Sequence, residues 1–203
     1  MLSGPVQRFV ETHGLTLPGA VRTTTTAGRV HLCYLLSELL VQTGAEIGVW
    51  EGQFSKMLCE HIRGLRLLCV DPWKCYSSYQ DPKNDQARLE LAYRLATATL
   101  TPYGCTILRT TSVEAAATVP DGSLDFIYLD ANHGESFVRQ DLEAWTPKVR
   151  SGGIVAGHDF VSSAKKPWLE VKPAVMAFTA VRGIGPVYVL AADKSPSFLW
   201  VQP

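Results

Sequence analysis

The chain has 203 residues, 46% of them hydrophobic and 19% charged, and its 19 basic residues balance its 19 acidic residues. This length suits one domain with a substantial core, and the balanced charge argues against broad electrostatic capture of nucleic acid or of an anionic membrane. No apolar run approaches the roughly 20 residues that cross a bilayer. The five cysteines form no C-x-x-C pair, and the first residues lack a secretory apolar segment. We therefore expect reduced thiols and a cytoplasmic location.

Helix and strand patterns alternate along the chain. We expect residues 1–28 to be an N-terminal extension or acceptor-site segment, with Thr23 to Thr26 in a loop, and residues 29–203 to form one domain. Apolar residues at helical spacing predict helices at 28–44, 53–62, 84–100, after 111, at 135–145 and after Pro173. Apolar runs bounded by turn residues predict strands at 45–49, 65–71, 105–110, 124–130, 152–159, 185–191 and 197–202.

Local signals place several helix ends. Asn84 or Asp85 can cap the helix at 84–100 with a side-chain oxygen. Thr111 and Glu114 have the spacing of a capping box, which predicts a short helix there. In the helix at 135–145 we expect Asp141 to lie on the solvated face.

The alternation of strands and helices implies a parallel sheet covered by helices on both faces. Right-handed crossovers bring the carboxyl ends of such strands to one edge, where ligands bind near the switch in strand order. Asp71, Asp130 and Asp159 all follow predicted strands. We therefore expect these carboxylates to face one crevice.

A glycine turn, EIGVWEGQFS, joins the first of these strands to its helix. Gly48 and Gly52 allow positive φ and a close approach of the backbone to a ligand, although a tight structural turn explains them equally well. The dinucleotide fingerprint G-x-G-x-x-G is absent, because Trp50 stands two residues after Gly48. Glu46 and Glu51 disfavour a pyrophosphate, and Glu46 suits a ligand that carries an ammonium group.

Asp71 ends the second strand of the predicted domain, after the glycine turn. A carboxylate at this point can accept two hydrogen bonds from a ribose diol. The structural alternative is a strand-end turn, because Pro72 follows. The rest of the pattern favours ribose binding.

Five segments in order, AEIGVWEGQFS, LLCVDPW, TSVEAA, DGSLDFIYLDANH and SGGIVAGHDF, resemble the class I S-adenosyl-L-methionine (SAM)-dependent methyltransferases. The last two predicted strands match the antiparallel ending of that family. The resemblance covers about residues 41–202. It implies an α/β fold, a three-layer doubly wound Rossmann-like sheet of seven strands in the order 3-2-1-4-5-7-6, with strand 7 antiparallel.

The resemblance also implies which residues bind SAM. Glu46 and Gly48 would line its methionine part with Gly52 nearby, and Asp71 would hold the ribose hydroxyls. The other implied positions are Trp73, Ser112, Val113 and Asp130. Ser112 or the backbone of Val113 would border the adenine. Trp73 would cover an adenine face or be a core tryptophan, and both interpretations stay open.

Within the family the chain is similar to small metal-dependent O-methyltransferases with a D-x-x-H motif. The resemblance makes Asp130 and Asp159 ligands of Mg²⁺ or another divalent cation, and His133 the general base. Catechol-type members have Asp-Asn at this strand end, where this chain offers either His158-Asp159 or Asp159-Phe160, and phenylalanine cannot ligate a metal. The third protein ligand is therefore His158 or water, or no metal binds. The structural alternative is that these side chains only cap strand ends.

Three functions remain open at this point. The first is SAM-dependent O-methylation of a small hydroxylated acceptor, a sugar or natural product, with N- and C-methylation not excluded. The second is an NAD-type oxidoreductase on a similar sheet, which the missing third glycine opposes. The third is a noncatalytic SAM-fold binding module, which the glycine turn and Asp71 oppose. We expect no nucleic-acid or membrane partner, and a homo-oligomer is left open.

The segment after the strand at 152–159 contains Lys165 and Lys166. We expect an exposed basic loop there, with part of the acceptor pocket as the alternative.

Overall fold

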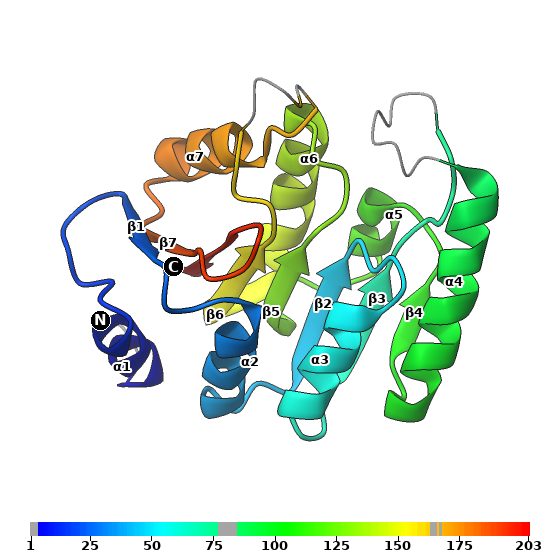
Figure 1. The fold of residues 1–203 in the computed structure, drawn as a ribbon, viewed down its shortest axis with the longest axis horizontal. Coiled ribbons are helices and arrows are strands. Elements are labelled where there is room, and N and C mark those ends of the chain that lie inside the picture. Colours follow the sequence, from blue (N-terminus) through cyan, green and yellow to red (C-terminus); the bar gives the residue numbers. More distant parts are fainter. Residues whose placement is uncertain (1–3, 77–84, 163–165, 167) are drawn as a thin grey trace.

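The structure is a computed structural model that describes residues 4–76, 85–162, 166 and 168–203. A single sheet lies between two layers of helices (Figure 1). In chain order the helices and strands are α1 (Gly4–Thr12), β1 (Val21–Thr24), α2 (Arg29–Glu38), β2 (Thr43–Ile47), α3 (Gln53–His61), β3 (Arg66–Val70), α4 (Gln86–Leu100), β4 (Thr106–Leu108), α5 (Ser112–Ala117), β5 (Leu124–Leu129), α6 (Glu135–Trp145), β6 (Val149–Gly157), α7 (Val171–Arg182), β7 (Val187–Leu190) and β8 (Ser197–Val201).

The described part of the chain forms an eight-stranded sheet in the order β1-β7-β8-β6-β5-β2-β3-β4. Strand β8 runs antiparallel to both of its neighbours, β6 and β7. The other pairs are parallel. With β2 counted as strand 1, β2 to β8 have the order 3-2-1-4-5-7-6. The predicted fold class, strand order and antiparallel strand are therefore confirmed.

The predicted number of strands is wrong by one, because β1 adds an eighth strand beside β7. Val21 pairs with Val187 and Thr24 with Leu190. The prediction of a loop from Thr23 to Thr26 is thus wrong for Thr23 and Thr24. Threonine is β-branched and fits a strand well, but four residues at a sheet edge have too little pattern to identify them.

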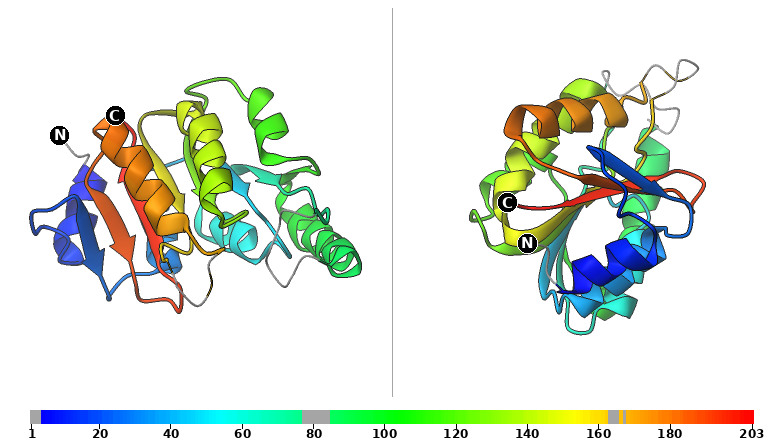
Figure 2. Two further views of the ribbon diagram at one scale, coloured as in Figure 1. Left: turned by 90° about the horizontal axis from the view of Figure 1, so that it is seen from above. Right: turned by 90° about the vertical axis from the view of Figure 1, so that its left-hand side faces the viewer.

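Each face of the sheet packs against its own group of helices (Figure 2). Helices α1 to α4 cover one face, in a core that includes Trp73. Helices α5 to α7 cover the other face, in a core that includes Trp145 and Trp200. None of the described helices combines the length and the apolar character that a membrane crossing needs.

The helix ends follow the predicted capping signals. The Asp85 carboxylate accepts the Arg88 N–H at 2.9 Å and caps α4, whereas Asn84 lies outside the described residues. Thr111 and Glu114 form the predicted capping box of α5. The structure therefore confirms both cap predictions. They could be made from the sequence because each cap depends only on local spacing.

Helix α7 begins at Val171, before Pro173, where the sequence predicted it would start only after the proline. Proline is tolerated in the first turn of a helix, because the N–H groups there have no partner within the helix. The expected start was therefore three residues too late.

The pairing of β2 with β5 requires a glycine. Gly44 lies opposite Phe126, and a Cβ added to Gly44 would overlap the Phe126 ring. We expect Gly44→Ala to lower the free energy of unfolding by about 1–3 kcal/mol, the usual cost of overpacking a core. Urea denaturation measures this change. The control is Gly4→Ala, whose added Cβ would meet only the Arg8 side chain at 3.5 Å. Equal stability of the two variants would contradict the prediction.

Candidate active site

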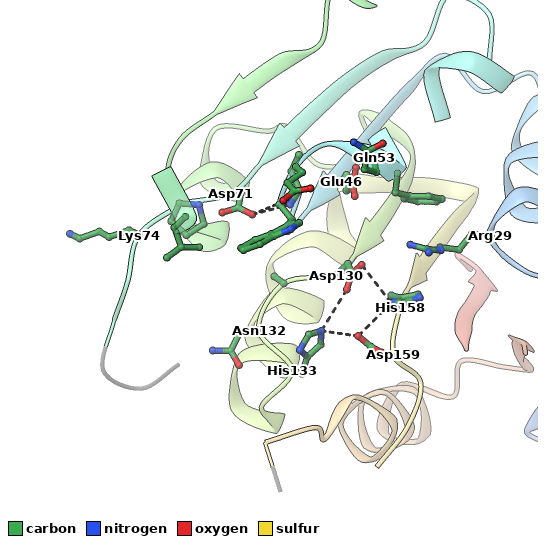
Figure 3. Close-up of a pocket in the computed structure, with 18 of the residues that line it drawn as sticks. Arg29, Glu46, Gln53, Asp71, Lys74, Asp130, Asn132, His133, His158 and Asp159 are labelled. Atoms are coloured by element: carbon green, nitrogen blue, oxygen red, sulfur yellow. Dashed lines mark hydrogen bonds and ion pairs between the residues drawn. The ribbon is translucent and has the colours of Figure 1, made fainter. Parts of the chain in front are cut away.

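A pocket of about 340 Å³ opens at the carboxyl ends of β2, β3, β5 and β6 (Figure 3). The parallel strands bring the acidic groups that end them to this edge, as the sequence predicted. The pocket is lined by Arg29, Glu46, Gly48, Val49, Trp50, Glu51, Gln53, Phe54, Asp71, Pro72, Lys74, Tyr76, Leu89, Asp130, Ala131, Asn132, His133, His158 and Asp159.

The glycine turn after β2 is shaped by contacts with the protein itself. Gly48 has φ +90°, and a Cβ there would overlap the Asp130 carbonyl group. Gly52 has φ +81° and precedes α3. Its open side faces Leu100 and Ala96 of α4, and Gly52 is not among the pocket-lining residues. Gly48 thus borders the predicted cofactor pocket, whereas Gly52 allows α3 and α4 to pack closely.

The Asp71 carboxylate closes the glycine turn with three backbone hydrogen bonds. Its Oδ2 accepts the N–H groups of Val49 and Trp50, both at 3.0 Å, and its Oδ1 accepts the Trp73 N–H at 2.8 Å. Burial raises the pKa of Asp71, and these bonds oppose that rise. A carboxylate has about four acceptor positions, so roughly one, on Oδ1, remains for a ligand in the pocket.

Glu46 is 2% exposed and lines the pocket. Burial raises the pKa of Glu46 to about 8, although the Ser55 hydroxyl donates a hydrogen bond to the carboxyl group. A buried carboxyl group of this kind ionises readily only when a positive charge approaches it. The site therefore suits a cationic ligand group.

Trp73 is fully buried and does not line the pocket. Its indole Nε1 donates to the Trp50 carbonyl oxygen at 2.8 Å, and its ring centroid lies 5.0 Å from that of Tyr93. Of the two interpretations left open by the sequence, the core tryptophan agrees with this position.

Ser112 and Val113 begin α5 and are not among the residues that line the pocket. The Ser112 hydroxyl donates to Asp141 and accepts the Trp145 Nε1–H at 2.9 Å, while Val113 is 49% exposed. Asp141 is 7% exposed, so its predicted place on the solvated face is wrong. Its spacing from Val138 and Trp145 matches the buried face of α6, and that signal was available in the sequence.

Four charged side chains meet at the ends of β5 and β6. His133 Nε2 lies 3.0 Å from Asp159 Oδ2 and 3.5 Å from Asp130 Oδ1. His158 Nδ1 lies 3.4 Å from Asp159 Oδ2 and 3.6 Å from Asp130 Oδ2. All four side chains are less than a quarter exposed. The two carboxylates therefore sit between the two imidazoles (Figure 3).

These four side chains, which we call the carboxylate–imidazole cluster, shift one another's pKa values. Burial alone would lower the pKa of each imidazole, but the paired Asp130 and Asp159 raise the pKa of His133 and of His158 to about 9. The imidazoles in turn hold the pKa values of both carboxyl groups below their usual range, against the effect of burial. Without another cation, the cluster at neutral pH is two carboxylates and two imidazolium ions.

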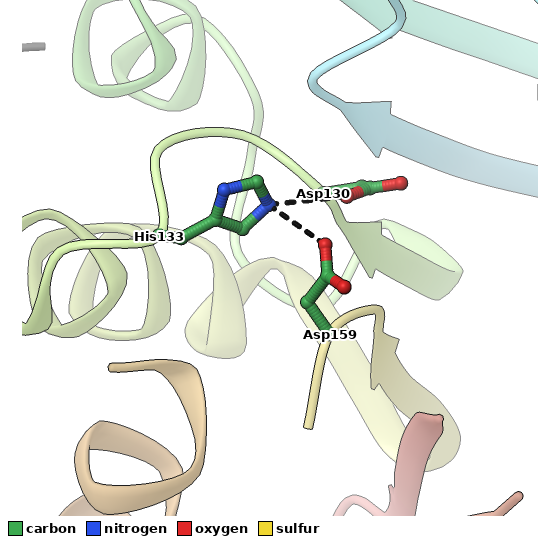
Figure 4. A group of neighbouring side chains, drawn as sticks. All are labelled: Asp130, His133 and Asp159. Carbon is green, nitrogen blue, oxygen red and sulfur yellow. Dashed lines mark ion pairs between the residues drawn. The ribbon is translucent and has the colours of Figure 1, made fainter. Parts of the chain in front are cut away.

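The geometry of the cluster also suits metal binding. Asp130, His133 and Asp159 each offer a ligand atom, and these atoms lie within 4.8 Å of one another (Figure 4). His158 contacts the same carboxylates, so the structure brings all four predicted residues together. Phe160 is 5% exposed and packs near Phe198, at 5.8 Å between ring centroids, so it takes no part in the cluster.

Backbone strain fixes the position of one of these carboxylates. Asp159 has φ +52°, in the left-handed region, which aspartate tolerates better than most residues. Its carboxylate also accepts the Ser195 hydroxyl. Strain of this kind concentrates at functional sites and is kept when the surrounding contacts determine it.

Several pocket residues were missed by sequence reasoning: Arg29, Gln53, Phe54, Lys74, Tyr76 and Asn132. Most of them follow a predicted site residue within a few positions, so their nearness to Glu46, Asp71 or Asp130 was a usable signal. Arg29 had no such signal, because it comes from a helix that precedes β2. In the predicted basic loop, Lys165 lies outside the described residues and Lys166 is exposed.

The buried Asp141 predicts a specific dependence of stability on pH. Burial raises the pKa of Asp141 to about 7 in the folded chain, whereas an unfolded aspartate titrates near ~3.9. The folded state therefore keeps the proton longer, and stability is lost as the pH rises from about 4 to about 7.

We expect Asp141→Asn to remove this loss. Relative to wild type, its free energy of unfolding should rise by a few kcal/mol between pH 4 and pH 7 and then level off, since one pKa unit corresponds to about 1.4 kcal/mol. Urea denaturation across this pH range measures the difference. Parallel curves for the two proteins would contradict the prediction.

Comparison with proteins of known structure shows a similar fold. The chain is similar to a candidate caffeoyl-CoA O-methyltransferase from Staphylococcus aureus, with 16% identity, a TM-score of 0.63 and coverage of 98% of this chain and 92% of the other. It is also similar to an O-methyltransferase from Bacillus cereus in complex with S-adenosylhomocysteine (SAH), with 13% identity, a TM-score of 0.59 and coverage of 100% of this chain and 92% of the other. The O-methyltransferase NovP is similar with 16% identity, a TM-score of 0.63 and coverage of 86% of this chain and 79% of the other. At these identities the likeness shows the fold.

Sequence comparison gives the family. No protein with a curated description is significantly similar to the chain. A family model described as a methyltransferase domain matches residues 45–160, which run from β2 through the glycine turn to Phe160 and include the whole carboxylate–imidazole cluster. This match spans more than half of the chain, which therefore belongs to the methyltransferase-domain family of class I, SAM-dependent enzymes.

Proposed function

We propose that this protein transfers the methyl group of SAM to a hydroxyl oxygen of a small acceptor, a sugar or natural product. The carboxylate–imidazole cluster carries the proposal, because it lies in the same pocket as Glu46, Gly48 and Asp71. One pocket can therefore hold a cofactor and place an acid–base group beside an acceptor.

In this proposal the cofactor lies along the end of β2. Glu46 binds the ammonium group of the methionine part, and the free acceptor position on Asp71 takes one ribose hydroxyl. Gly48 keeps that end of the strand open to the cofactor. Trp73, Gly52, Ser112 and Val113 are not among the residues that line the pocket, so this proposal gives their side chains no direct contact with the cofactor.

Methyl transfer requires alignment of the acceptor oxygen, the methyl carbon and the sulfonium sulfur. The sulfonium is a good leaving group, so the protein has mainly to make the acceptor oxygen electron-rich. We assign this role to His133 as general base, oriented by Asp130 and Asp159. Since those carboxylates raise the pKa of His133 to about 9, a base at neutral pH needs another positive charge on them.

The donor set fits a divalent cation such as Mg²⁺. Two part-buried carboxylates meet there, and among the described residues the buried Nε2 atom of His158 lacks a hydrogen-bond partner. Asp130 and Asp159 would hold the cation with His158 as a third ligand, leaving His133 as base. A bound cation would lower the pKa of an acceptor hydroxyl. The alternative is that His133 itself is a ligand.

No observation favours the two alternative functions. Strand β8 runs antiparallel between β6 and β7, as expected for the methyltransferase family rather than for an NAD-type oxidoreductase. A noncatalytic SAM-binding module would not need the part-buried carboxylate–imidazole cluster in the same pocket.

The first test is binding of the cofactor product. We expect S-adenosylhomocysteine (SAH) to raise the thermal midpoint, since a ligand selective for the folded state stabilises it by about 2.7 kcal/mol at 100 times its Kd. NAD is the control and should give no shift. Differential scanning fluorimetry and calorimetry measure both ligands, and stabilisation by NAD alone would reverse the proposal.

The second test separates the roles within the cluster. We expect Asp130→Asn and Asp159→Asn each to abolish Mn²⁺ or Mg²⁺ binding in calorimetry, because each removes a hard ligand. The control, Asp121→Asn, changes an exposed carboxylate paired with Lys148 and should leave binding intact. His133→Ala should keep metal and SAH affinity and lower kcat by about 10²–10⁴ once an acceptor is found.

Two outcomes would change this assignment. Loss of metal binding in His133→Ala would make His133 a ligand instead of the base. Full methyl transfer in excess EDTA would remove the metal from the proposal. In that metal-free case the rate should rise with pH toward about 9, because His133 must first lose its proton.

A further inference from the structure

Arg29 enters the pocket from outside the predicted site. It is the first residue of α2, and its backbone N–H donates to Asp193 Oδ2 at 2.7 Å. Asp193 lies between β7 and β8, and a Cβ on Gly28 would collide with its carboxylate. Gly28 therefore lets Asp193 hold the amino end of α2, which fixes the point from which the Arg29 side chain extends.

The guanidinium group of Arg29 has few partners in the protein. It lies over the Phe54 ring, 5.6 Å from the centroid, and its Nε is 3.9 Å from Asp193 Oδ2. Within the described residues no acceptor takes a hydrogen bond from its terminal nitrogens. The side chain is 34% exposed and points into the pocket toward Asp130 and His158 (Figure 3). Its fork of donors is available to a ligand.

The charges around Arg29 are suited to a zwitterion. Arg29 and Glu46 line the same pocket, and the positive charge of Arg29 acts to lower the pKa of Glu46. Among the described lining residues, Lys74 is the second residue of lysine or arginine type. It lies beyond Asp71, on the opposite side of the pocket from Arg29 (Figure 3). A ligand with an ammonium and a carboxylate on one carbon would match Glu46 and Arg29 at the same time.

We propose that Arg29 binds the carboxylate of the methionine part of SAM while Glu46 binds its ammonium group. This inference rests on the proposed function and adds a residue to it. A guanidinium group binds a carboxylate with two parallel hydrogen bonds, which fixes direction as well as charge. Stacking on Phe54 and the Asp193 contact restrict the side chain before the ligand arrives, which lowers the entropic cost of binding.

The test compares two ligands that differ only at the amino-acid end. SAH carries that end, and 5′-methylthioadenosine lacks it. We expect Arg29→Gln to raise the Kd for SAH about 10- to 100-fold, the range for a lost charged hydrogen bond, and to leave the Kd for 5′-methylthioadenosine within about threefold. Isothermal titration calorimetry in EDTA measures both. The control is Arg8→Gln, an exposed arginine paired with Glu38, which should change neither.

Arg29→Lys tests the fork geometry and guards against misfolding of the glutamine variant. Lysine keeps the charge, so its Kd for SAH should lie between those of wild type and Arg29→Gln. Unchanged SAH affinity in a folded Arg29→Gln protein overturns the inference and leaves the carboxylate of an acceptor as the other source of the same chemistry. An equal loss for both ligands also overturns it, because the effect would then be structural.

These results are distinguishable from failure of the proposed function. If wild type binds neither SAH nor 5′-methylthioadenosine, the SAM pocket itself is rejected and the inference falls with it. If wild type binds SAH and Arg29→Gln binds it equally well, only the role of Arg29 is rejected.

Discussion

The pocket depends on the close approach of Gly48 to the Asp130 carbonyl group, which leaves no space for a side chain at position 48. Gly48 donates its N–H to Val70 at the end of β3, at 2.8 Å, and Asp130 donates its N–H to Ile47 at the end of β2, at 2.7 Å. These bonds continue the sheet beyond its last strand residues. Three parallel strands therefore end at one level, and the acidic groups that follow them share one pocket.

The carboxylates of this pocket are stabilised in two different ways. Asp71 is bound by backbone N–H groups, which cannot lose a proton in the physiological range. Asp130 and Asp159 are bound by imidazoles, which can. The hydrogen bonds that stabilise Asp71 therefore do not change with pH in the physiological range. The imidazoles of the cluster, in contrast, can lose their protons when another cation binds the carboxylates. This division matches the proposed O-methylation, in which the cofactor is held in place and an acceptor hydroxyl is deprotonated.

The parallel sheet and its acidic edge could be predicted because they follow from patterns within single segments, whereas the strand order was predicted from the family resemblance. Each central strand is an apolar run ending in a polar residue, and parallel pairing then determines where those residues meet. Strand β1 could not be predicted, because a four-residue edge strand is selected by its neighbour β7 rather than by its own sequence. Arg29 was missed for a related reason, since its position depends on the contact with Asp193, far away in the chain.

The site residues that the family resemblance implies fall into two groups: those positioned by the backbone and those that depend on the direction of a side chain. Gly48, Asp71 and Asp130 owe their positions to the backbone at the strand ends, and they line the pocket. Ser112 and Trp73 depend on the direction of a side chain, and here both point to partners in the protein: Asp141 and the Trp50 carbonyl. Backbone geometry is shared across a fold, whereas side-chain direction depends on local packing. The side chains that line the pocket beyond these strand ends come from other parts of the chain, including Arg29 from α2, Phe54 from α3 and Asn132 from the segment after β5.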